Sequence, residues 1–144
     1  MPQVVALVVL LAVTAAVGVW WRARQGRVRV ARPAAAPAEA AQTAQAQWAG
    51  LGVTLGERAT FLQLSAEVCA PCRATARVLG SLAAAEDGVA HHELDVDHHL
   101  DLVSRLHVLT TPTVLVLDPD GVEIARASGA MTPAQARQAL ALAG

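Results

Sequence analysis

The sequence predicts an α/β domain, in which helices cover a central mixed sheet, preceded by one transmembrane helix. Short apolar runs of strand length alternate with segments whose apolar residues recur at helical spacing, which is the pattern of an α/β sheet. A Cys-x-x-Cys pair directly follows one of these runs, at residues 69–72. Residues 4–21 form an uncharged run rich in Val, Leu and Ala. A chain of 144 residues has room for one folded domain plus this apolar segment.

The first segment, residues 1–24, is expected to be a single transmembrane anchor. As a helix, the run at residues 4–21 would span about 27 Å, close to the thickness of a bilayer's hydrocarbon core. Trp20 and Trp21 end the run and arginines follow at once, as suits groups at the level of the lipid headgroups. A cleaved signal peptide is the alternative, but it would carry positive charge before a shorter apolar run. We therefore expect residues 4–21 to lie in the lipid bilayer.

Charge is distributed very unevenly along the chain. Residues 1–32 contain five arginines and no acid, whereas residues 33–144 contain six arginines and twelve acids. Positive residues beside a single span tend to stay on the cytoplasmic side, so we expect a single-pass cell-membrane protein with a cytoplasmic domain. A domain outside the membrane is the alternative. The acidic domain lacks the basic and aromatic clusters that bind nucleic acid, and this excludes a nucleic-acid partner.

Residues 25–47 are expected to join the anchor to the domain. They begin as an arginine-rich collar and continue as a low-complexity stretch of Ala, Pro and Gln, which is typical of a spacer and can become helical after Pro37. The folded domain is expected at residues 48–144, with Trp48 as a packing residue at its start.

Within the domain, the elements alternate between strand and helix. Asp87-Gly88 predicts the end of the helix that the cysteine pair opens, and Pro119 with Gly121 predicts a hairpin turn. The predicted strands are residues 61–64, 89–96, 113–117 and 122–127. The predicted helices are residues 72–86, a helix capped by Asp97 that carries Leu100, Val103 and Leu106, and residues 134–143 after the N-cap Thr132.

The cysteine pair predicts thiol–disulfide exchange. Exchange needs one accessible thiolate with a lowered pKa and a second cysteine close enough to resolve the mixed disulfide. At a helix start, Cys69 meets the helix dipole and is expected to be the nucleophile, while Cys72, one turn later, is expected to resolve. Two alternatives remain open: an inert structural disulfide, or half of a zinc site. The other zinc ligands would come from a histidine cluster, His91, His92, His98 and His99, which otherwise suits a solvated strand end.

The residues around the pair extend the pattern. Residues 61–73 run from a strand into Cys-Ala-Pro-Cys-Arg, Thr111-Pro112-Thr113 follows about forty residues later, and Gly129-Ala130 comes after the hairpin. Over roughly residues 50–144 this combination resembles the thioredoxin family. The resemblance implies a thioredoxin-like fold in which Pro112 is a cis-proline packed against the cysteines and Thr111 docks an extended substrate. Ala70-Pro71 is similar to the Gly-Pro of reducing thioredoxins, and these two residues complete the expected substrate-binding set.

Three positions depart from the family pattern. Val68 stands where a Trp commonly precedes the first cysteine, and Ser65 replaces a frequent aromatic residue, which removes part of the hydrophobic recognition surface. Gln63 replaces the buried acid that assists proton removal from the second cysteine. Proton removal from Cys72 is therefore expected to be slower, or to use water or Glu67.

Together these features predict a membrane-tethered thiol–disulfide oxidoreductase that acts as a protein-disulfide reductase. Its partners would be disulfide-containing client proteins and, by resemblance, a thiol electron donor such as a thioredoxin-reductase-type flavoprotein or a membrane thiol carrier. No cofactor and no metal is expected. The alternatives are a metal-binding or metal-delivery module and a thioredoxin-fold adaptor that does not catalyse exchange.

Overall fold

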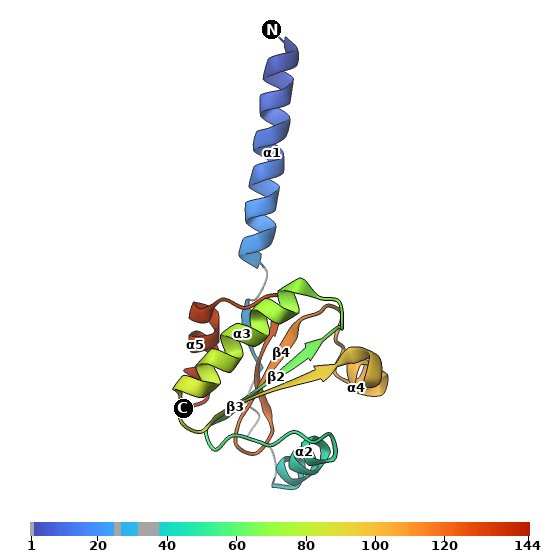
Figure 1. Cartoon of the computed structure of the whole chain (residues 1–144), viewed down its shortest axis with the longest axis vertical. Coiled ribbons are helices and arrows are strands. Elements are labelled where there is room, and N and C mark those ends of the chain that lie inside the picture. Colours follow the sequence, from blue (N-terminus) through green and yellow to red (C-terminus); the bar gives the residue numbers. More distant parts are fainter. Residues whose placement is uncertain (1, 25–26, 32–37) are drawn as a thin grey trace.

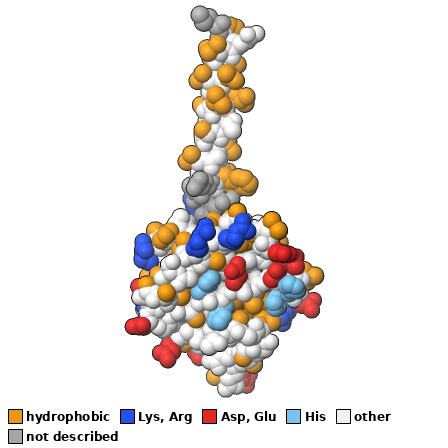
Figure 2. Space-filling model, in the orientation of Figure 1, with side chains coloured by type: hydrophobic (Ala, Val, Ile, Leu, Met, Phe, Trp, Pro, Cys, Tyr) orange, Lys and Arg blue, Asp and Glu red, His pale blue; other side chains and the backbone are white. Residues whose placement is uncertain are grey.

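The N-terminal helix stands apart from a small sheet domain. The computed structural model describes residues 2–24, 27–31 and 38–144. Helix α1 (Pro2–Arg24) extends away from the domain (Figure 1). Its first 20 residues, Pro2–Trp21, have a mean hydropathy of 2.5 and none is buried, so this helix is long and apolar enough to cross a membrane. Apolar side chains cover its visible face (Figure 2).

The domain is built on one mixed sheet. Its strands are β1 (Val28–Val30), β2 (Ala59–Ser65), β3 (Val89–Asp95), β4 (Thr113–Leu117) and β5 (Glu123–Ser128). They lie in the order β1-β5-β4-β2-β3, with β2 and β3 parallel and every other pair antiparallel. The parallel pair requires a crossover, and helix α3 (Ala70–Ala85) supplies it.

Helices cover both faces of this sheet. The helices besides α1 and α3 are α2 (Ala38–Gly50), α4 (Leu100–Arg105) and α5 (Pro133–Leu140). Side chains alternate along β2, so Phe61 packs with Leu79 of α3 in one core, and Leu62 packs with Leu102 of α4 in the other. Every residue of β2 is buried because the strand is central and covered on both faces.

The predicted order of strands and helices is confirmed, with a difference at Asp97. The sequence predicts that Asp97 caps the helix that follows β3. Instead, the Asp95 carboxylate accepts a hydrogen bond of 2.8 Å from the Asp97 N–H and caps a short 3₁₀ turn, Val96–His98. Helix α4 begins after His99, which makes no side-chain cap. Asp95 is the capping residue in place of Asp97 because a 3₁₀ turn lies between β3 and α4.

The predicted spacer contains a strand and a helix. Val28–Val30 forms β1, which pairs with the outer edge of β5, although the sequence analysis expects no strand in residues 25–47. The expected helix after Pro37 is confirmed as α2. Residues 25–26 and 32–37 of the spacer lie outside the described residues. The anchor is thus joined to the sheet through β1, ahead of the low-complexity stretch.

Trp48, near the end of α2, packs as expected. Its side chain is 4% exposed and lies in the core with Leu62. The indole N–H donates a hydrogen bond of 2.7 Å to the carbonyl oxygen of Gly121, in the turn between β4 and β5. This contact ties α2 to the hairpin.

Candidate active site

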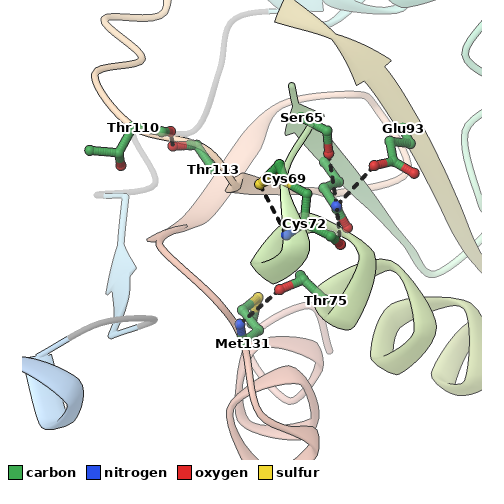
Figure 3. The surroundings of a disulfide bond; sticks show 9 residues. Ser65, Cys69, Cys72, Thr75, Glu93, Thr110, Thr113 and Met131 are labelled. Atoms are coloured by element: carbon green, nitrogen blue, oxygen red, sulfur yellow. Dashed lines mark hydrogen bonds between the residues drawn. A yellow bond between two sulfur atoms is a disulfide. The ribbon is translucent and has the colours of Figure 1, made fainter. Parts of the chain in front are cut away.

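The two cysteines lie at the N-terminus of α3, where β2 leads into the helix (Figure 3). They form a disulfide, with their Cα atoms 5.2 Å apart. Cys69 is the N-cap residue of α3, and its Sγ accepts a hydrogen bond of 3.2 Å from the Cys72 backbone N–H. An N-cap sulfur meets unpaired N–H groups and the positive end of the helix dipole, and both favour a thiolate.

The two cysteine residues differ in exposure. Cys69 is 8% exposed and Cys72 is 1% exposed. A disulfide partner or reductant approaching from solvent can therefore reach the Cys69 sulfur first, while Cys72 lies beneath it at the end of the sheet.

The loop before β4 carries the expected proline. The Thr111–Pro112 peptide bond is cis, as the resemblance implies. The Thr113 hydroxyl donates a hydrogen bond of 2.7 Å to the Thr110 carbonyl, and the Gly129 N–H donates one of 2.7 Å to the Pro112 carbonyl. These bonds hold the proline loop between the start of β4 and the end of β5.

A groove of about 370 Å³ lies along this loop. Its lining comes from α1, from the first turn of α3, from the proline loop and from the end of β5 with the two residues after it: Trp21, Pro71, Thr110, Thr111, Pro112, Ser128, Gly129 and Ala130. Below the groove, the Met131 N–H donates a hydrogen bond of 3.1 Å to the buried Thr75 hydroxyl of α3. The structure thus brings Pro71, Thr111 and Pro112 of the expected substrate-binding set into one groove.

Gln63 lies beneath the cysteine pair and is fully buried. Its side-chain Nε2 is 2.8 Å from the Ser65 Oγ, 2.9 Å from the Cys72 carbonyl oxygen and 3.1 Å from a Glu93 carboxylate oxygen. The amide therefore joins β2, α3 and β3 at one point. Its Oε1 is buried without a hydrogen-bond partner among the described residues.

Glu93 is the carboxylate nearest this network, and the sequence analysis did not identify it. Parallel pairing of β2 with β3 sets Glu93 directly opposite Gln63, so both side chains lie on the face that α3 covers. The carboxylate that the sequence favoured, Glu67, lies exposed in the turn before Cys69. Only the strand register identifies Glu93, because the two positions are thirty residues apart in the chain.

Two large apolar side chains beside the site are almost fully exposed. Val68, directly before Cys69, is 93% exposed, and Leu109, just ahead of the proline loop, is 92% exposed. The sequence analysis noted Val68 only as a departure from the family and did not single out Leu109.

The histidines of β3 lie on opposite faces of the strand. His91 lies on the α3 side, where its Nδ1 is 4.0 Å from the place a Cβ on Gly80 would occupy. Burial lowers the pKa of His91 below its ordinary value of 6.5, against an opposing effect of Glu93. The His92 Nε2 lies 2.8 Å from the Thr54 carbonyl oxygen. Among the described residues no three metal-ligating side chains gather, so the histidines and cysteines do not form one site.

Comparisons with known proteins agree with this arrangement. The sequence model of the family described as a thioredoxin-like domain matches residues 53–144. Thioredoxin-2 of Saccharomyces cerevisiae is 31% identical over 86 residues, which cover 60% of this chain and 81% of the yeast protein.

Solved structures show the same likeness. Fasciola hepatica thioredoxin is 27% identical, with a TM-score of 0.54 over 62% of this chain and 84% of that chain. Thioredoxin from Trypanosoma brucei brucei is 25% identical, with a TM-score of 0.55 over 67% of this chain and 81% of that chain. With its Cys69–Cys72 pair at the start of α3, the chain belongs to the thioredoxin family and has the site of a thiol–disulfide oxidoreductase.

Proposed function

We propose that this protein is a membrane-anchored protein-disulfide reductase that works by dithiol exchange through Cys69 and Cys72. The observation that carries the proposal is the position of Cys69. Its sulfur caps α3 and accepts the Cys72 N–H, and Cys69 is the more exposed residue of the pair, next to the groove along Pro112. This position combines a stabilised thiolate with access for a client.

The reaction transfers two electrons from the dithiol to a client disulfide. In the reduced protein, the Cys69 thiolate attacks one client sulfur, which forms a Cys69–client disulfide and releases the other client sulfur as a thiolate. The Cys72 thiolate then attacks the Cys69 sulfur, which restores the Cys69–Cys72 disulfide and releases the second client thiolate. Cys72 loses its proton before this second step, and the two client thiolates take up protons from solvent. A thiol electron donor then reduces the protein disulfide.

The groove supplies the binding site for the client in this proposal. Thr111, Pro112 and Pro71 line the groove, and Ala70 precedes Pro71 in the first turn of α3. A narrow groove of this kind suits an extended segment of chain that carries a disulfide.

The anchor in this proposal is α1. Its stretch Pro2–Trp21 is apolar over the length of a bilayer core, and arginines follow that stretch at once. By the positive-inside rule, these arginines favour a cytoplasmic position for the domain. In that compartment a thioredoxin-reductase-type flavoprotein or a membrane thiol carrier would supply electrons. A tag at each terminus and protease treatment of sealed cells test this orientation: protection of the C-terminal tag supports it, and digestion contradicts it.

The test of function is insulin-disulfide reduction with dithiothreitol as donor, using the full chain in neutral detergent micelles. The full chain is needed because a fragment beginning at Trp48 would lose β1. We expect turnover by the native chain, none by Cys69→Ser, and a trapped mixed disulfide with insulin in Cys72→Ser. Native-like turnover in Cys69→Ser would sink the mechanism. A folded chain without turnover would leave the adaptor or metal-module alternatives.

A further inference from the structure

The groove of the proposed reductase is closed on one side by the membrane anchor. Trp21, the last residue of the apolar stretch, lines the same groove as Pro71, Thr111 and Pro112. Its side chain is 66% exposed, so it forms a wall of the groove and does not fill a core. A Trp at the end of a span sits at the level of the lipid headgroups.

The strand register requires this closeness independently of the position of Trp21. Strand β1 starts at Val28, opposite Ala127 of the antiparallel strand β5. Two residues beyond Ala127, the Gly129 N–H bonds to the Pro112 carbonyl oxygen at 2.7 Å. The start of β1 and the proline loop therefore lie at the same end of the strands.

The chain between anchor and sheet is too short to separate them. Helix α1 ends at Arg24 and β1 begins at Val28, a connection that reaches at most about 14 Å when fully extended. Figure 1 shows α1 leaving the domain at the end where α3 begins. The end of the sheet that carries the cysteines therefore faces the membrane in which α1 lies.

Basic side chains lie at the same end of the sheet. A second cavity, of about 390 Å³, shares Ser128 with the groove and is lined by Arg27, Arg29 and Arg126, of which Arg126 is already paired with Glu123 at 2.7 Å. Guanidinium groups beside a span suit the phosphates of the headgroup layer. The positive charge at this end of the sheet is thus complementary to the phosphates at a bilayer surface.

We propose that the groove binds disulfide-bearing segments of other membrane proteins that lie within about 20 Å of the bilayer surface, with Trp21 as a specificity-determining wall. This inference rests on the proposed reductase function and names its class of client. An extended segment next to a transmembrane span lies at the level of the groove and reaches it without a long tether. A disulfide held far from the surface reaches the groove only when its tether folds back.

The experiment uses the full chain in phosphatidylcholine nanodiscs with dithiothreitol and a single-span reporter peptide. In the near reporter, the only disulfide closes a loop directly after the transmembrane span. The far reporter carries the same loop after about 40 Gly/Ser residues, an average reach of roughly 35 Å. We expect the near disulfide to be reduced at least about fivefold faster.

Two insertions of equal length provide the decisive comparison. About 15 Gly/Ser residues between Gln25 and Gly26 would move the sheet away from the anchor, and the near-to-far ratio should fall to about one. The same insertion between Ala34 and Ala35, after β1, leaves the sheet attached and should keep the native ratio. If the second insertion abolishes the preference equally, or the first leaves it intact, the inference is wrong.

Trp21→Ala tests the role of the wall. We expect Trp21→Ala to reduce the near reporter more slowly than the native chain does, and to lower the near-to-far ratio. Faster reduction of both reporters would mean that Trp21 covers the groove, and this would overturn the proposal. Failure of the function itself is distinguishable, because the native chain would then reduce neither insulin nor either reporter.

Discussion

The side-chain amide of Gln63 donates a hydrogen bond of 2.9 Å to the backbone carbonyl of Cys72. The same nitrogen lies 3.1 Å from the Glu93 carboxylate, so the amide bridges the resolving cysteine and an acid on the next strand. A carboxylate at position 63 could not do this, because the groups around the position already include a carbonyl oxygen and a carboxylate. In this chain the acid lies one strand away from the position that the family resemblance indicates.

Gln63→Asp should therefore destabilise the protein. Burial and the neighbouring Glu93 would raise the pKa of the new carboxyl above its unfolded value of about 3.9. A raised carboxyl pKa means that stability is lost as pH rises, so the loss should be small near pH 4 and reach about 2–4 kcal/mol at pH 7. Urea denaturation of the full chain in micelles measures it. A Glu93→Gln background should recover part of the loss, and native stability of Gln63→Asp at pH 7 contradicts the interpretation.

The exposed apolar pair Val68 and Leu109 should matter for client binding and not for folding. Each Ser variant should raise KM for insulin about 3- to 10-fold, because partial burial of such a side chain is worth about 1 kcal/mol. The thermal midpoint should stay unchanged, since both side chains are more than nine-tenths exposed. Leu100→Ser, 66% exposed on α4, is the matched control. An equal rise of KM in the control, or none in either variant, speaks against a docking surface.

His91 should make the protein less stable in mild acid. Burial lowers its pKa in the folded state, so below pH 6.5 the unfolded chain binds the proton more readily than the folded chain. The free energy of unfolding should fall between pH 7 and pH 5, by less than about 1.4 kcal/mol per pH unit, the limit for one proton. His91→Gln should flatten this dependence, whereas His98→Gln, at an exposed position, should keep it. An identical slope in native and His91→Gln protein assigns the effect to another group.

Two glycines should respond to Ala in opposite directions. Gly80 lies inside α3, and an added Cβ there meets only the His91 ring at 4.0 Å, so Gly80→Ala should stabilise by about 0.5–1 kcal/mol. At Gly56 the Cβ would lie 2.4 Å from the Ala59 carbonyl oxygen and 2.5 Å from that of Gly88. These are backbone atoms, so Gly56→Ala should cost about 3 kcal/mol. Urea midpoints rank the three proteins, and a stable Gly56→Ala chain would show that this backbone can shift.

The sequence by itself determined the features that depend on neighbours in the chain. Apolar periodicity predicted β2 through α5 in order, Thr132 and Pro133 marked the start of α5, and Cys-x-x-Cys marked the start of α3. Each of these signals acts within a few residues, through caps, turns and side-chain spacing, and can therefore be recognised in the sequence alone. The departure at Gln63 was visible as well, but its consequence was not.

Only the tertiary structure decided which distant residues meet. Strand β1 is only three residues long, Val-Arg-Val, and this brief alternation of apolar and charged residues forms a strand because it pairs with the free edge of β5. Glu93 lies next to Gln63 because of the register of two parallel strands. Trp21 lines the Pro112 groove because β1 holds the anchor at that end of the sheet. Pairing between strands far apart in the chain depends on the whole sheet, and no local pattern encodes it.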